Sequence, residues 1–356
     1  MNKLTGVSLF SSAGIAEYYF KRCGIDIVLA TELVSKRCDL HEFLYPNCKM
    51  IQGDITDANV FNLVNEEIKK DKCNFLIATP PCQGMSSLGK KEYSTDKRNY
   101  LVFYILDIIE DNDFDYILIE NVPKFLKLFF PYENGLFDLC SIINKKFGDR
   151  YSIDSHVLNA MNYGVPQSRP RGIIRMWKKG KKWDLPKEST PITLKEAIGD
   201  LPSLETGEDS GIKWHFAKHH NDREVLAMKH TPEGKSALKN AVYFPKKVNG
   251  EPIKGFHNTY TRMKWDEPCP ARTMNSGNLG GHNNVHPGKL MPDGTYSDAR
   301  VLTLRELFIV TSLPADIDLP NWCSDNFIRQ MIGEAIPPRF AERIVEGINY
   351  DKTSKK

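Results

Sequence analysis

The first half of the chain alternates short apolar runs, rich in β-branched residues, with amphipathic stretches of helical length. Strands that alternate with helices pair in parallel through crossover connections, so this order predicts a Rossmann-like α/β domain with helices on both faces of a parallel sheet. The expected strands cover residues 6–10, 26–31, 49–52, 74–78, 116–119, 152–158 and 172–176. The expected helices cover residues 15–22, 36–44, 58–70, 100–110 and 136–146.

Beyond Trp177 the alternation gives way to sequence rich in Gly, Pro, Asn and His, with one short predicted helix over 193–199. Helical periodicity returns over 303–309 and 329–348, where Pro337-Pro338 predicts a helix start and Ile344, Val345 and Ile348 have core spacing. We therefore expect one domain over 1–180, completed by a C-terminal helix at 322–350. A smaller irregular domain is expected over 181–321, with a polar tail at 351–356.

Positive charge is concentrated in one segment. Residues 178–264 carry 17 Lys and Arg against 11 Asp and Glu, a balance of +6, although the whole chain has a net charge of +3. Seven of the nine histidines lie between His215 and His286. This mixture suits a nucleic-acid surface, and a solvated lysine-rich surface explains it equally well. The pair His219-His220 has no partners at ligand spacing, so no metal site is expected.

Eight cysteines are scattered along the chain without any CxxC pair, which argues against a zinc ribbon or a disulfide scaffold. The early apolar run is too short for a signal sequence, and no stretch has transmembrane length. These features predict a soluble protein with reduced thiols in the cytoplasm, without membrane partners.

The strand expected over 74–78 ends in Thr79-Pro80-Pro81-Cys82. Prolines donate no backbone hydrogen bond and cannot continue a central strand, so Cys82 is expected just past the carboxyl edge of the sheet. Ligands of open α/β sheets bind at that edge, which makes Cys82 a candidate nucleophile. Taken alone, a small buried residue in a turn explains the cysteine better.

Acidic and small residues follow the other expected strands. A turn of small residues over 10–14 comes after the first strand, Glu32 closes the second, and Asp54 follows the third. Acids at successive strand ends outline a nucleoside site, although each one alone is typical of a helix cap. Glu120-Asn121 ends a further strand. Arg169 and Arg171 alternate at the last one, so both guanidinium groups are expected on one face.

The ordered motifs at 80–84 (PPCQG), 120–122 (ENV), 167–171 (QxRxR) and 333–338 resemble those of the DNA (cytosine-5) methyltransferases of bacterial restriction–modification systems, over about residues 6–348. The resemblance implies a class I S-adenosylmethionine-dependent methyltransferase sheet plus a target-recognition domain. It assigns Cys82, Glu120, Arg169 and Arg171 to catalysis. The S-adenosyl-L-methionine site would comprise Phe10, Ser12, Ala13, Gly14, Glu32, Leu33, Asp54, Ile55, Pro81, Leu101, Glu334 and Ala335. DNA would contact Gln83, Ser86, Asn121, Arg262, Arg272, Asn275, Asn278 and His282.

The implied reaction adds the Cys82 thiolate to carbon 6 of cytosine, so that carbon 5 becomes nucleophilic. The base must leave the helical stack to be reached, and the polar segment 83–99 is expected to close over it. Two positions depart from the family pattern, because Ser12 and Glu334 stand where glycine and asparagine are usual.

We expect the enzyme to be a monomer that binds double-stranded DNA and no metal. The recognition sequence and the presence of a cognate restriction endonuclease stay open. The alternatives are an RNA (tRNA) cytosine-5 methyltransferase of the same family, a nicotinamide-dependent oxidoreductase suggested by Glu32, and a DNA-binding relative with impaired catalysis. The missing GxGxxG motif speaks against the oxidoreductase, and the retained catalytic set speaks against the impaired relative.

Overall fold

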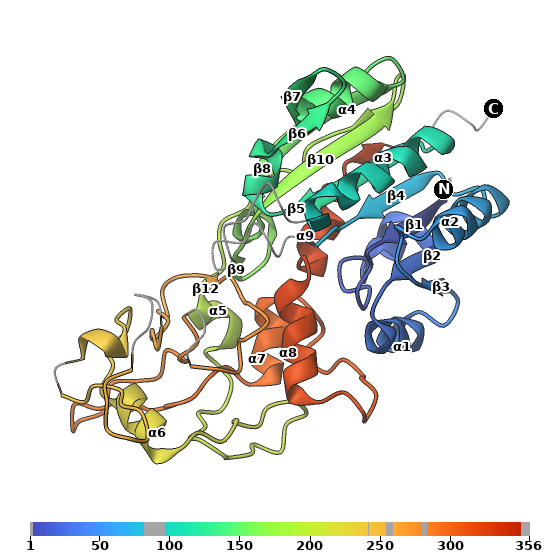
Figure 1. Ribbon diagram of the computed structural model, residues 1–356. Coiled ribbons are helices and arrows are strands. Elements are labelled where there is room, and N and C mark those ends of the chain that lie inside the picture. Colours follow the sequence, from blue (N-terminus) through green and yellow to red (C-terminus); the bar gives the residue numbers. More distant parts are fainter. Residues whose placement is uncertain (1–2, 82–96, 241, 254–258, 280–282, 350–356) are drawn as a thin grey trace. The chain divides into compact units, whose positions relative to one another are not determined.

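The computed structural model describes residues 3–81, 97–240, 242–253, 259–279 and 283–349. The chain divides into two compact units. Unit 1 comprises Met1–Asn159, Pro170–Lys187 and Ala341–Lys356, and unit 2 comprises Ala160–Arg169 and Glu188–Phe340. Both are drawn in sequence colours in Figure 1. The functional domain boundaries expected from the sequence stay a prediction.

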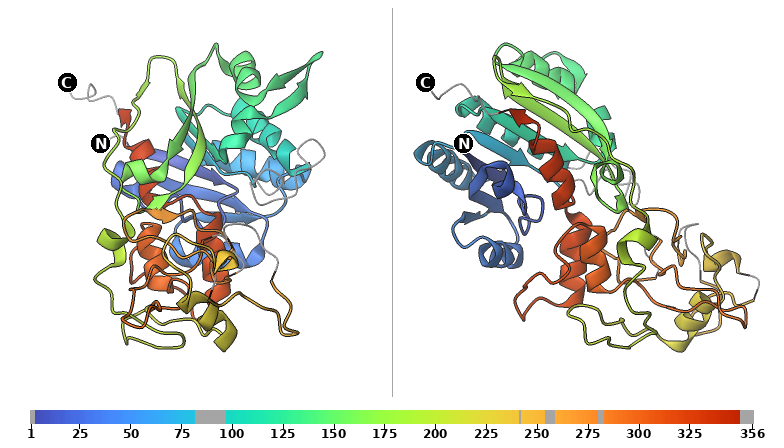
Figure 2. Two further views of the ribbon diagram at one scale, coloured as in Figure 1. Left: turned by 90° about the vertical axis from the view of Figure 1, so that its left-hand side faces the viewer. Right: turned by 180° about the vertical axis from the view of Figure 1, so that it is seen from behind.

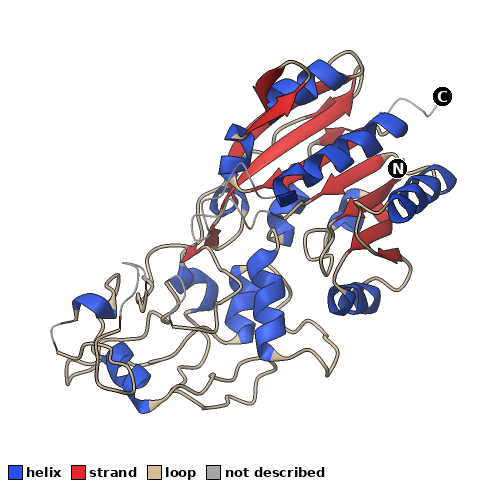
Figure 3. Ribbon diagram, viewed as in Figure 1, coloured by secondary structure: helices blue, strands red, loops and turns tan. Residues whose placement is uncertain are grey.

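Unit 1 is built on a seven-stranded sheet of order β3-β2-β1-β4-β5-β10-β8. Figure 3 draws the strands in red and the helices in blue. Its strands are β1 (Leu4–Leu9), β2 (Ile25–Glu32), β3 (Lys49–Gln52), β4 (Phe75–Ala78), β5 (Tyr116–Asn121), β8 (Tyr151–Asn159) and β10 (Pro170–Lys178). The connecting helices are η1 (Phe20–Cys23), α1 (Ser35–Leu44), α2 (Ala58–Lys70), η2 (Lys97–Tyr100), α3 (Leu101–Asp111), η3 (Pro123–Lys127) and α4 (Leu139–Phe147). The α/β prediction is confirmed, and the expected bounds of β3 and α2 are those observed.

The sheet is mostly parallel rather than wholly so, because β10 runs antiparallel to both β5 and β8. A parallel return needs a crossover of a dozen or more residues, usually a helix. Only the short segment 160–169 separates β8 from β10, and it contains η4 (Ala160–Tyr163) and β9 (Gln167–Ser168) but no α-helix. The short connection explains the antiparallel pairing.

Two expected helices are wrong in part. Residues 15–22 form turns and then η1, which ends at Gly24 with a left-handed φ of 73°. The helix expected from residue 136 begins only at Leu139, because the residues before it form β7 (Gly135–Asp138), which pairs with β6 (Phe129–Tyr132). The apolar residues of this hairpin fit both the helical period of 3.6 and the strand period of 2, so the sequence pattern did not distinguish a strand from a helix there.

Alternating side chains of the central strands are buried on both faces of the sheet. Leu76 and Ile117 pack in one core cluster with residues of α2, α3 and α4. On the other face, the Phe75 ring meets Phe20 of η1 at 5.8 Å between ring centroids. Helices α2, α3 and α4 therefore cover one face of the sheet, and η1 packs on the other. Figure 2 shows the sheet and its helices from two further sides.

The C-terminal segment of unit 1 contributes β13 (Ile348–Asn349), which pairs with β11 (Lys182–Trp183). Helix α9 (Pro338–Val345) begins at the predicted proline, and Ile344 and Val345 are buried as expected. Within the described part of the chain, no helix is long and apolar enough to cross a membrane.

Unit 2 contains little regular structure. Its elements besides η4 and β9 are α5 (Leu194–Ile198), α6 (Asp222–Lys229), η5 (Ala237–Lys239), β12 (Cys269–Pro270), α7 (Leu304–Val310) and α8 (Asp325–Glu334). Helices α5 and α7 begin with capping boxes, at Thr193 and Thr303. Long buried loops leave many backbone carbonyls without a partner in secondary structure, and these need donors from side chains.

Buried arginines supply those donors. Arg262 is fully buried, and its guanidinium donates to the carbonyls of Thr231 (2.8 Å), His286 (2.6 Å) and Met228 (2.6 Å). Burial lowers the pKa of Arg262 to about 10, so the group is still charged at neutral pH. A planar fork of five donors suits this task better than any other side chain.

Replacing Arg262 with lysine tests this role. Arg262→Lys keeps the charge but leaves buried carbonyls unpaired, and we expect a loss of about 3 kcal/mol in the free energy of unfolding. Thermal and denaturant unfolding measure it. The matched Arg223→Lys, on the exposed face of α6, should change stability by less than about 0.5 kcal/mol. Equal melting of the two variants would contradict the assignment.

Candidate active site

Five chain segments meet at one edge of the sheet in unit 1. β1 pairs in parallel with β2 and β4, β2 with β3, and β4 with β5. The residues that follow or end these strands therefore lie at the same carboxyl edge, where α/β proteins bind ligands. They include Phe10, Glu32, Asp54, Pro80 and Glu120, as the sequence predicted.

The turn after β1 is tied to the end of β2. Glu32 accepts hydrogen bonds from the backbone N–H groups of Ser12 (3.0 Å), Leu33 and Val34 (both 2.9 Å), and it is 8% exposed. Phe10 and Ser12 both have left-handed φ angles, 58° and 50°. A non-glycine residue pays a conformational cost there, which gives a physical reason why glycine is usual at position 12.

The remaining residues expected at the cofactor differ in exposure. Ala13 and Ile55 are buried in the interior, whereas the Leu33 side chain is 60% exposed. Asp54 is exposed, and one of its carboxylate oxygens accepts hydrogen bonds from Thr56. Glu334 and Ala335 belong to unit 2, at the end of α8.

Two side chains fix the segment that leads to Cys82. The Thr79 hydroxyl donates to the carbonyl of Phe10 (3.0 Å), and the Asn121 amide donates to the carbonyl of Pro80 (3.0 Å). Asn121 also accepts from the N–H of Val122 and is 3% exposed. The sequence assigned Asn121 to DNA and missed Thr79, although a threonine between a strand and two prolines was a usable signal.

Glu120 forms an ion pair with Arg171, with 2.8 Å between Oε1 and Nε, and both side chains are largely buried. The antiparallel register of β10 with β5 places Gly172 opposite Asn121 and Ile173 opposite Glu120. A Cβ on Gly172 would lie 3.2 Å from the carbonyl oxygen of Val122, so a small residue suits this crossing. The pairing of strands thus positions the carboxylate and the guanidinium together.

Arg169 has different partners. Its guanidinium donates to the carbonyls of Arg272 (2.7 Å) and Gly333 (2.9 Å), all within unit 2. A Cβ on Gly333 would lie 2.2 Å from the Thr273 backbone, so this approach requires glycine. Arg169 thus binds backbone carbonyls, whereas Arg171 binds a carboxylate, and the expectation that both guanidinium groups lie on one face stays a prediction.

The residues expected to read DNA separate into two groups. Arg262 and Arg272 are fully buried, and Arg272 donates to the carbonyls of Pro270 and Asn283, so we assign both to the packing of unit 2. Asn275 and Asn278 are exposed. Cys82, Gln83, Ser86, His282 and most of the expected closing segment lie outside the described residues.

Four other cysteines are poor nucleophiles. Burial raises the pKa of the Cys38 thiol to about 11 and those of Cys48 and Cys73 to about 12, and it also raises that of Cys269. A nucleophilic cysteine needs the thiolate, which such burial disfavours. These cysteines fill the interior.

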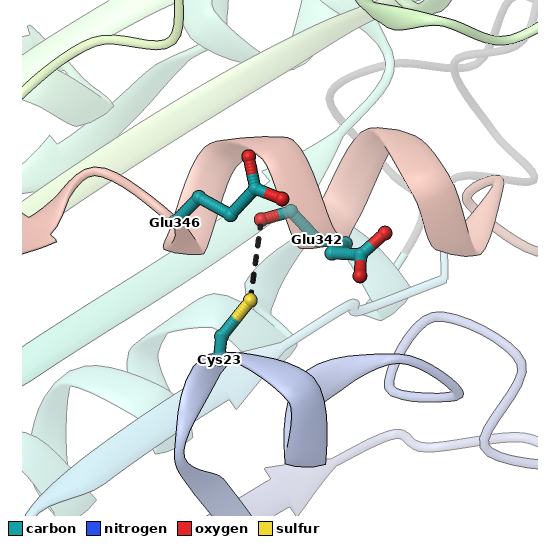
Figure 4. A group of neighbouring side chains, drawn as sticks. All are labelled: Cys23, Glu342 and Glu346. Atoms are coloured by element: carbon teal, nitrogen blue, oxygen red, sulfur yellow. Dashed lines mark hydrogen bonds between the residues drawn. The ribbon is translucent and has the colours of Figure 1, made fainter. Parts of the chain in front are cut away.

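Cys23, Glu342 and Glu346 lie together in unit 1, with potential ligand atoms within 4.8 Å of one another (Figure 4). Cys23 donates to the backbone carbonyl of Glu342, which is the dashed line in the figure. Glu342 pairs with Arg22 and Glu346 with Arg343. Because arginines already neutralise both carboxylates, the group is explained by the packing of α9 against η1.

Comparison with known proteins identifies the family. The model of the C-5 cytosine-specific DNA methylases matches residues 4–349. The chain is 47% identical to the Type II methyltransferase M1.HgaI of Avibacterium volantium, over 97% of this chain and 98% of that protein. It is 29% identical to the Type II methyltransferase M1.HphI of Haemophilus parahaemolyticus, over 97% of this chain and 86% of that protein.

Solved structures share the fold. A prophage-encoded DNA modification methyltransferase candidate of E. coli matches with a TM-score of 0.67 and 22% identity, over 97% of this chain and 98% of that one. The DNMT2 of Spodoptera frugiperda matches with a TM-score of 0.60 and 18% identity, over 96% and 99%.

The sheet has the α/β architecture in which ligands bind at the carboxyl edge, and the family model and the curated relatives place the chain in the class of methyltransferases. Within that class, the chain belongs to the family of C-5 cytosine-specific DNA methylases, as the resemblance predicted. It is an enzyme that transfers a methyl group to carbon 5 of cytosine in DNA.

Removing the Asn121 amide tests whether its hydrogen bond to the carbonyl of Pro80 positions the segment that leads to Cys82. We expect Asn121→Ala to lower the rate of methyl transfer by about 10- to 100-fold, because a misplacement of about 1 Å at a reacting group is enough for such a loss. Single-turnover kinetics with saturating cofactor and DNA measure it. Asn144→Ala is the control, since the exposed Asn144 amide also donates to a backbone carbonyl. An equal rate in both variants would refute this positioning role.

Proposed function

We propose that the protein is a sequence-specific methyltransferase of a Type II restriction–modification system, acting on double-stranded DNA. The observation that carries the proposal is the buried Glu120–Arg171 pair at the sheet edge where the Asn121 amide holds the carbonyl of Pro80, two residues before Cys82 in the sequence. Identity of 47% to a Type II methyltransferase over nearly the full length of both chains supports DNA over RNA as the substrate. The protein would act in the bacterial cytoplasm, as a monomer, beside a separate cognate endonuclease.

The cofactor residues fit the chemistry of S-adenosylmethionine. Glu32 and Asp54 offer carboxylate oxygens for ribose hydroxyls and the adenine amino group, and Phe10 and Leu33 offer apolar surface. Ser12, Gly14, Pro81 and Leu101 would border the site in unit 1. When bound, this cofactor supplies an electrophilic methyl group.

Carbon 5 of cytosine is too weak a nucleophile to take a methyl group directly. The Cys82 thiolate would add to carbon 6, and the electron pair of the 5,6 double bond would become available at carbon 5 as Glu120 gives a proton to nitrogen 3. After methylation, water would remove the proton from carbon 5. The carbon–sulfur bond would then break, the thiolate would leave, and the proton on nitrogen 3 would return to Glu120.

Arg171 would hold Glu120 and donate a hydrogen bond to the base carbonyl oxygen, because its planar fork can serve both. Arg169, tied to backbone carbonyls, would act as a positioning residue. The target cytosine must be flipped out of the duplex to meet these groups. Unit 2 would read the sequence, with Asn275 and Asn278 available at its surface.

Bisulfite sequencing of DNA from a methylation-deficient host that expresses the protein tests this function. Protected cytosines are expected in one short sequence context, and they should vanish with Cys82→Ser, because a serine hydroxyl is far less nucleophilic than a thiolate. Cys140→Ser, at a partly buried cysteine on α4, should keep the protection.

Two outcomes would contradict the proposal. Protection that survives Cys82→Ser removes the covalent mechanism. A folded, cofactor-binding protein that protects no cytosine in DNA but methylates tRNA moves the substrate to RNA.

A further inference from the structure

Unit 2 contains a cavity of about 570 Å³ outside the residues assigned to catalysis. Its wall is formed by the segment before α6, the segment before Gly280 and one side of α8. Most of its side chains are polar, and many are hydrogen-bond donors. The lining residues used below are Lys218, His219, Asn275, Asn326, Arg329 and Gln330.

Arg329 is 1% exposed, yet its hydrogen bonding is incomplete. Its Nε donates to Asp325 at 2.6 Å, whereas Nη1 is buried without a hydrogen-bond partner among the described residues. A buried guanidinium donor without an acceptor is costly. An acceptor that enters the cavity would remove that cost.

Lys218 converges on the same place. A Cβ built on Gly277 would lie 3.2 Å from Lys218 Nζ and 3.1 Å from Arg329 Nε, so both cations approach one point beside a residue without a side chain. Nζ donates to the neutral amide oxygen of Asn326 at 3.3 Å. Asp325 already pairs with Arg329, whereas Lys218 forms no ion pair among the described residues, so the ammonium charge is available to an anion in the cavity.

The acidic residue on the wall is already engaged. Glu224 pairs with His220, with 3.4 Å between the carboxylate and Nδ1. The hydrogen bond from His220 lowers the pKa of Glu224, with a smaller contribution from Lys218. His220 therefore engages the Glu224 carboxylate, and Asn275, Gln330 and His219 offer further N–H donors on the wall.

We propose that this cavity, which we call the Lys218–Arg329 pocket, binds a backbone phosphate of the substrate DNA. The inference rests on the proposed function, because it takes duplex DNA as the ligand. A phosphodiester offers charged acceptor oxygens that suit an unpaired guanidinium donor, an ammonium and amide N–H groups together. A base edge presents a mixture of donors and acceptors, and it would leave the Lys218 ammonium without an anionic partner.

The experiment measures binding of the full-length protein to a labelled duplex of arbitrary sequence at several salt concentrations. Each neutralised phosphate adds about 0.9 to the slope of log K against log salt. We expect Lys218→Gln to reduce the slope by about 0.9, and Lys218→Arg to keep it. Lys213→Gln is the matched control, because Asp318 already neutralises the exposed Lys213.

Bisulfite sequencing of each variant's host DNA separates this inference from the proposed function. Methylated DNA together with an unchanged slope for Lys218→Gln would overturn the pocket alone. A loss of affinity confined to the methylated sequence, without a change in slope, would indicate a base contact and also overturn it. If inorganic phosphate binds through Lys218 while the salt slope of DNA binding is unchanged, the pocket is a site for a small free anion, and the proposal of a DNA phosphate is overturned.

Discussion

The antiparallel pairing of β10 with β5 is the interaction on which the active site depends. It sets Gly172 opposite Asn121 and Ile173 opposite Glu120, so Arg171 reaches the Glu120 carboxylate from the adjacent strand. Asn121, the next residue of β5, donates its amide to the carbonyl of Pro80 and thereby ties the end of the segment after β4 to the same sheet edge. One register thus fixes an acid, its arginine and the approach to Cys82. A shift of one residue would turn each side chain to the other face of the sheet.

Unit 2 solves a different physical problem. Binding residues are often carried on loops. The backbone carbonyls of buried loops, however, find no hydrogen-bond partner in a helix or a sheet. Arg262 and Arg272 satisfy such carbonyls, and Arg300 pairs with Asp298 and Glu306 in the interior. Positive charge in this part of the sequence therefore has two uses. Some cations hold the loops together, and others, such as Lys218, are left to meet an anionic ligand.

The sequence predicted the elements of unit 1 well, because strands β3 and β4 and helix α2 have clear periods and clear ends. It also placed the acids and Pro81 at one sheet edge, since the carboxyl ends of parallel strands must meet. It did not separate buried arginines from exposed ones in the loops of unit 2, because a guanidinium that binds carbonyls looks the same in sequence as one that binds DNA. It also missed the antiparallel β10, whose direction depends on the length of the connection after β8.

The claim that Glu120 and Arg171 act as one unit can be tested by a double-mutant cycle. Single-turnover methyl transfer would be measured for the wild type, Glu120→Gln, Arg171→Gln and the double variant, with saturating cofactor and DNA. Residues that act as a unit are strongly non-additive, so the account predicts that the double variant is about as slow as the slower single variant. Independent roles would multiply the two losses, and that result would contradict the account.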